Sequence, residues 1–87
     1  MNMYIKKMLA AVAKHYALLG KEVGFSVVDL YRIAKKGAKV ALMTYSGNEG
    51  EKFSQCIVFY ARKAILCEIA LRKEANYTSP MLSSFDA

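Results

Sequence analysis

The sequence has few of the residues from which catalytic and metal sites are usually built. Its 87 residues include one histidine, two cysteines, one proline and no tryptophan. A zinc site needs three or four ligands held within bonding distance of one ion, and Cys56 and Cys67 lie too far apart along one predicted helix to share an ion with His15. Gly-x-Gly-x-x-Gly and phosphate-loop motifs are also missing. We therefore expect a protein that is not an enzyme and that carries no metal or other cofactor.

The small number of cysteines also bears on the cellular compartment. Eleven residues of helix place the α-carbons of Cys56 and Cys67 about 16 Å apart, which is beyond the reach of a disulfide. Two unpaired thiols are typical of a reducing compartment, so the sequence predicts a cytoplasmic protein. The chain has no run of about 18 uncharged apolar residues, so no segment is expected to span a membrane.

The sequence is rich in apolar residues and in positive charge. Apolar residues form 55% of the chain, which excludes a disordered tail even though 13 Lys and Arg exceed 7 Asp and Glu. The length allows one domain, whose core is marginal for an isolated monomer. The whole excess of positive charge lies in residues 1–47, because basic and acidic residues balance in 48–87.

Apolar residues recur at helical spacing in three segments, which predicts an all-α, three-helix domain over residues 1–76. The helices are expected at 3–19, 26–45 and 49–75, followed by an irregular tail at 77–87. Gly20 suits a C-terminal cap of the first helix, and Ser26 with Asp29 is typical of a capping box at the start of the second. Gly37 indicates either a close neighbouring backbone or a break in the second helix.

The third predicted helix carries two apolar stripes on roughly opposite sides. One stripe contains Phe53, Ile57, Tyr60, Ala64, Cys67 and Leu71. The other stripe is a candidate surface for forming a homo-oligomer, since three helices in a chain this short rarely cover both sides of one helix. Its residues are Val58, Phe59, Ile65, Leu66 and Ile69. The alternative is that this helix is the central one, covered by the other two helices and the tail.

The second predicted helix carries a basic stripe formed by Arg32, Lys35, Lys36 and Lys39. These four residues follow the i, i+3, i+4, i+7 spacing, so their side chains leave the helix on one side. Neighbouring cations repel one another, and binding a polyanion relieves that repulsion and releases counterions. Tyr31 borders the stripe and is a candidate for stacking on a base. The alternatives are a solvated face and a helix-turn-helix, although 40–43 offers no side chains that read bases.

Together these patterns predict a small non-catalytic binding protein that self-associates and binds nucleic acid, a nucleotide or another phosphate-bearing ligand through the basic stripe. The alternative from a different class is a protein-interaction inhibitor or adaptor that docks onto an acidic protein partner. A third alternative places the basic stripe on an anionic membrane surface, but the Ala-rich opposite side of that helix is poorly suited to insertion.

Overall fold

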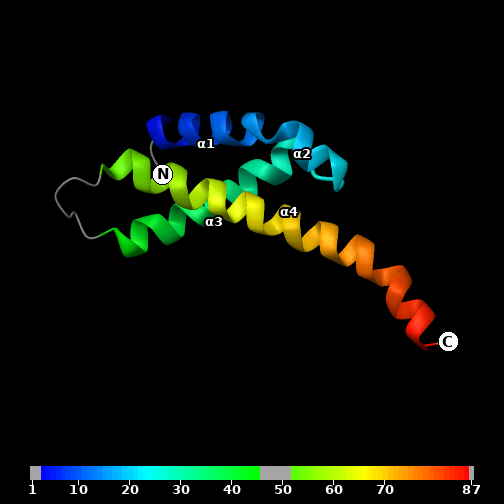
Figure 1. The fold of residues 1–87 in the computed structure, drawn as a ribbon. Helices are drawn as coiled ribbons and strands as arrows, with labels where there is room; N and C mark the ends of the chain where they lie inside the picture. Colours follow the sequence, from blue (N-terminus) through cyan, green and yellow to red (C-terminus); the bar gives the residue numbers. More distant parts are fainter. Residues whose placement is uncertain (1–2, 46–51, 87) are drawn as a thin grey trace.

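The computed structural model describes residues 3–45 and 52–86, with side chains up to Ala75. Regular secondary structure in these ranges is entirely helical, which confirms the all-α prediction. Helices α3 and α4 run antiparallel as a hairpin, and α1 packs against both of them (Figure 1). The helices are α1 (Met3–His15), α2 (Ala17–Glu22), α3 (Val27–Thr44) and α4 (Phe53–Asp86).

The first predicted helix is divided into α1 and α2 at Tyr16. The Tyr16 N–H is shared between the carbonyl oxygens of Val12 and Ala13, at 3.3 and 3.2 Å, which is a common arrangement where one helix ends. The sequence predicts Gly20 as the helix cap, but Gly20 lies inside α2, where a β-carbon would collide with the side chain of buried Leu30. The C-cap is Val23, and the following Gly24 has a φ of 86°, which glycine adopts readily.

Helix α3 begins with the predicted capping box. The Asp29 N–H donates to the Ser26 hydroxyl oxygen at 3.2 Å, and the Ser26 N–H donates to the Asp29 carboxylate at 2.9 Å. These bonds satisfy backbone donors that have no partner within the helix. The helix then continues without a break through Gly37 to Thr44, which excludes a helix-turn-helix between residues 27 and 44.

Gly37 lies where the backbone of α4 comes close to α3. A β-carbon at this position would be 2.9 Å from the Ala61 α-carbon and would also collide with the carbonyl group of Tyr60. The α3 residues around this crossing are small, and Ala34, Ala38 and Ala41 are all fully buried. Of the two roles that the sequence allowed for Gly37, the close backbone is therefore the one observed.

Helix α4 differs from its predicted range at both ends. Its expected start at residue 49 lies outside the described residues, and the described helix begins at Phe53. The irregular tail predicted for 77–87 is wrong up to Asp86, because α4 continues to that residue. Asn76 and Pro80 lie within α4 and do not end it.

The core takes residues from both apolar stripes of α4. Its buried positions at Ile57, Ala61, Ile65 and Ile69 recur every four residues. Each four-residue step turns about 40° further around the helix, so the buried line winds from one stripe to the other. The prediction that the second stripe faces another chain is therefore wrong for Ile65 and Ile69, which are 0% and 4% exposed within this monomer.

The remaining three residues of the predicted oligomer interface are divided between core and surface. Val58 is partly buried and packs against the core. Phe59 and Leu66 are 59% and 43% exposed. Self-association through this stripe therefore has two side chains available on the surface instead of five.

Candidate functional site

The basic stripe lies on the side of α3 that faces away from the core. Arg32, Lys36 and Lys39 are exposed and Lys35 is partly buried, whereas the core side of the same helix is formed by Leu30, Ala34, Gly37, Ala38 and Ala41. Within the described part of the chain, no carboxylate lies within ion-pair distance of these four cations. The structure thus brings the stripe together as the spacing predicted and leaves its charge largely uncompensated.

Asp29 lies one turn before Arg32 but is already engaged in the capping box. The backbone and hydroxyl hydrogen bonds from Ser26 are the largest causes that lower the pKa of Asp29 below its usual value of 3.8, and the charges of Arg32 and Arg72 add to them. The carboxylate is therefore directed at the helix terminus, and it faces a positive environment. It reduces the charge of the stripe at one end only.

Tyr31, the residue predicted to stack on a base, has a partly buried ring that packs against the core cluster. Its part in ligand stacking stays a prediction.

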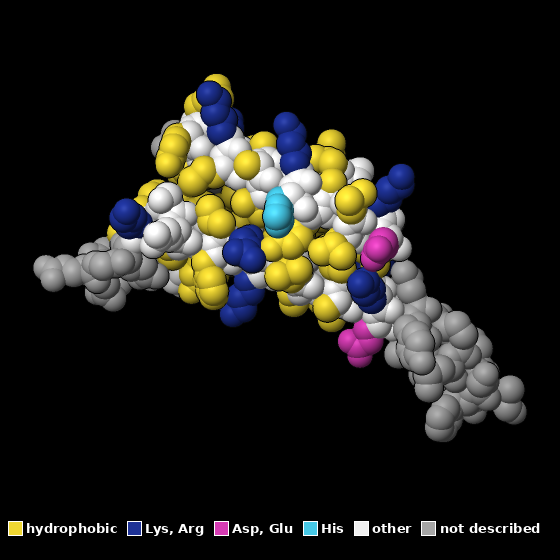
Figure 2. Space-filling view, turned by 45° about the horizontal axis from the view of Figure 1, so that its top comes forward, with side chains coloured by type: hydrophobic (Ala, Val, Ile, Leu, Met, Phe, Trp, Pro, Cys, Tyr) yellow, Lys and Arg dark blue, Asp and Glu magenta, His cyan; other side chains and the backbone are white. Residues whose placement is uncertain are grey.

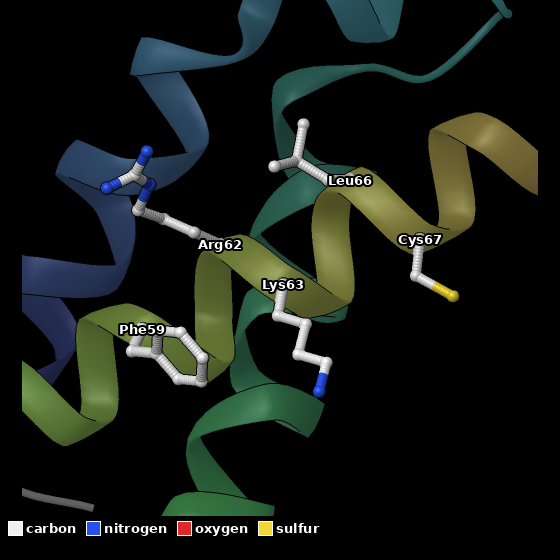
Figure 3. A pocket seen from close by; sticks show the side chains of 5 residues that line it. All are labelled: Phe59, Arg62, Lys63, Leu66 and Cys67. Carbon is white, nitrogen blue, oxygen red and sulfur yellow. The ribbon is translucent and has the colours of Figure 1, made fainter.

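A second candidate surface lies on the outward side of α4, where we define the α4 groove by Phe59, Arg62, Lys63, Leu66 and Cys67. These five residues line an open depression of about 530 Å³. Figure 3 shows Arg62 extending towards α1 and Lys63 towards α3. Their positions follow the spacing i, i+3, i+4, i+7, i+8, a signal present in the sequence that was divided between two stripes and so was missed.

Arg62 is held in place across the α1–α4 boundary. Its Nε donates a hydrogen bond of 2.9 Å to the hydroxyl of Tyr16, which is itself buried. This bond uses one of the five N–H donors of the guanidinium and leaves the terminal nitrogens for an anion. Lys63 lies over the Phe59 ring at 6.0 Å, so its ammonium group also stays near the groove.

Basic side chains lie on α4 as well as on the first half of the chain. On the face drawn in Figure 2, Lys and Arg side chains lie among exposed hydrophobic ones, and acidic side chains gather at one end. At that end Lys73 of α4 pairs with Glu22 of α2 at 3.9 Å. Residues 53–75 of α4 contain four basic and two acidic side chains.

The residues considered for metal or nucleophilic chemistry do not come together. Cys56 is buried and Cys67 is exposed, and neither forms a disulfide. His15 is exposed, with its ring edge-on to Tyr16 at 5.0 Å. Among the described residues, no three His, Cys, Asp or Glu side chains are close enough to hold a metal ion.

Within the described ranges, no helix is both long enough and apolar enough to cross a bilayer. Comparisons of the chain with models of protein families, with curated proteins and with solved structures gave no significant match.

Proposed function

We propose that this chain is a non-catalytic binding protein for a polyanion, most favourably nucleic acid, and that Arg32, Lys35, Lys36 and Lys39 form the contact surface. The observation that carries the proposal is the uncompensated charge of the basic stripe on a continuous, exposed helix face. A row of cations at one- to two-turn spacing contacts successive phosphates without reading bases. Binding is therefore expected to depend strongly on salt and weakly on sequence.

Self-association is not part of this proposal. The sequence favoured it because an apolar stripe of α4 had no evident cover, and most of that stripe is used inside the monomer. The proposed binding does not need a second copy, since the four cations lie on one helix of one chain. The oligomeric state stays a prediction, measured by light scattering against the monomer mass of 9.7 kDa.

Charge reversal tests the proposal with a matched control. Lys36→Glu/Lys39→Glu places two negative charges on the basic stripe, whereas Lys7→Glu/Lys14→Glu makes the same charge change at exposed positions of α1. Binding of a fluorescent single-stranded DNA, followed by anisotropy, is expected to weaken at least about tenfold more in the α3 variant. Equal weakening in both variants would show that overall charge, and not the basic stripe, drives binding.

A further inference from the structure

The α4 groove is a second surface, separate from the basic stripe, and it differs from the stripe in chemistry. Phe59 and Leu66 expose a large part of their apolar area there, and both lining charges, Arg62 and Lys63, are positive. The groove continues into the α3–α4 seam, where Val40, Tyr60 and Ala64 line a second depression that shares Lys63 and Cys67. Apolar surface that is joined across two helices and bordered by charge is typical of a protein-docking site.

We propose that the α4 groove docks an acidic amphipathic helix of another protein. The apolar face of such a helix covers Phe59, Leu66 and Cys67, while its flanking carboxylates meet Arg62 and Lys63. Phe59 to Leu66 spans about 10 Å along α4, which matches about two turns of a partner helix. The partner helix thus occupies a surface that the proposed polyanion binding does not use.

The charges of the groove favour this occupant over a second copy of the chain. In a two-fold pair formed through this groove, the same surface patch of each copy faces the other, so the only lining charges brought together are the positive ones of Arg62 and Lys63. In the described residues no acidic side chain lines the groove. Glu68, the nearest along the helix, is two residues beyond Leu66 and so projects from the opposite side. An acidic partner supplies the missing charge.

The fold also prepares Arg62 for a carboxylate. Its hydrogen bond to Tyr16 fixes the guanidinium at the border of the groove before any partner arrives. Less side-chain freedom is then lost on binding than for an arginine that extends into solvent. A carboxylate can also take two parallel N–H bonds from the terminal nitrogens.

The test uses three synthetic peptides of about 18 residues with matched length and fluorescent label. The first peptide is helical, with leucines on one face and glutamates on both flanks. The second keeps the leucines and replaces glutamate with lysine, and the third scrambles the first. Binding is measured by anisotropy to the full chain, to Phe59→Ala/Leu66→Ala, and to Leu18→Ala, which removes an apolar side chain that is 81% exposed on α2. Circular dichroism establishes that each variant is folded.

The expected result is binding of the acidic amphipathic peptide alone. Phe59→Ala/Leu66→Ala weakens it at least about tenfold and Leu18→Ala leaves it within about twofold. Neutralising the basic stripe with Lys36→Ala/Lys39→Ala weakens it no more than Lys7→Ala/Lys14→Ala does. DNA binding of Phe59→Ala/Leu66→Ala matches that of the unaltered chain, so failure of this inference and failure of the proposed function remain distinguishable.

Three outcomes would overturn the inference. The first is equal binding of the acidic and lysine-containing peptides, or of the scrambled peptide. The second is a dimer of the unaltered chain that Phe59→Ala/Leu66→Ala converts to a monomer in light scattering, which would assign the groove to a second copy. The third is loss of DNA binding in the same variant, which would assign it to the polyanion.

Discussion

At Gly37 the absence of a side chain sets the distance between α3 and α4. Glycine inside a helix normally costs about 1 kcal/mol relative to alanine, so the residue is kept for a reason other than helix formation. The reason is the backbone of Tyr60 and Ala61, which occupies the space of a β-carbon. The backbone of an adjacent helix cannot make room by changing rotamer, as a side chain can.

Gly37→Ala is therefore expected to destabilise the fold by about 1–3 kcal/mol, against the intrinsic preference of alanine for helix. The measurement is the free energy of unfolding from urea denaturation. Lys39→Ala, on the solvent side of the same helix, is the control and is expected to change stability by less than about 0.5 kcal/mol. A Gly37→Ala protein as stable as the unaltered chain would contradict the observed packing.

Asp29 gives a prediction about pH. Its pKa is lowered in the folded state, mainly by the hydrogen bonds from Ser26, so the ionised carboxylate stabilises the fold above the ordinary value of 3.8. That contribution is lost as the pH falls through the lower folded pKa. Asp29→Asn is thus expected to be less stable than the unaltered chain at pH 7, with a difference that shrinks as the pH falls below 3.8.

The measurement for Asp29 is urea denaturation at several pH values in this range. Glu68→Gln serves as the control, because it removes an exposed negative charge on α4 that belongs to no helix cap. A difference between Asp29→Asn and the unaltered chain that stays constant with pH would show that the carboxylate does not act through its charge.

On the scale of helices, the two neighbours Ile65 and Leu66 distinguish the buried and exposed sides of α4. Ile65 is fully buried, whereas Leu66 lies in the α4 groove. Ile65→Ala is expected to cost about 2–5 kcal/mol of unfolding free energy, because it leaves a cavity, and Leu66→Ala less than about 1 kcal/mol. Urea denaturation of the two variants measures this difference, and the reverse order of stability would show that α4 is rotated relative to the described fold.

The same helix shows what a sequence can and cannot predict. Caps are local, so Ser26 and Asp29 identified the start of α3 from four residues. The spacing also predicted correctly that the four basic residues lie on the side of α3 that faces away from the core, since the residues on the core side are small or apolar. The core side of α4 was not predictable from an amphipathic pattern, since both stripes are apolar and the buried line crosses between them as it winds towards Ile69.

The α4 groove follows from that winding. Ile57 of one stripe and Ile65 of the other are both buried in the core. Phe59, Leu66 and Cys67 therefore lie together on the outward side of α4. Their outward position depends on how α4 crosses α1 and α3, which is set by tertiary packing at Gly37 and Ala61. The helical spacing of these residues places them on one side of α4, but the crossing geometry is needed to show that this side faces outward.

For the molecule as a whole, the fold separates two surfaces of different character. The outward side of α3 carries uncompensated charge with no apolar centre, and the outward side of α4 carries apolar side chains bordered by Arg62 and Lys63. A polyanion needs the first kind of surface and an amphipathic protein helix needs the second. We therefore expect mutations on the two surfaces to affect binding independently.

If the basic stripe contacts phosphates, the salt dependence of DNA binding shows it directly. The slope of log affinity against log salt concentration counts the cations that replace counterions. Arg32→Ala/Lys36→Ala/Lys39→Ala is expected to flatten this slope by roughly 2–3 units, and Lys6→Ala/Lys7→Ala/Lys14→Ala, with the same loss of charge on α1, by less than about 1 unit. Equal slopes for the two triple variants would contradict the claim.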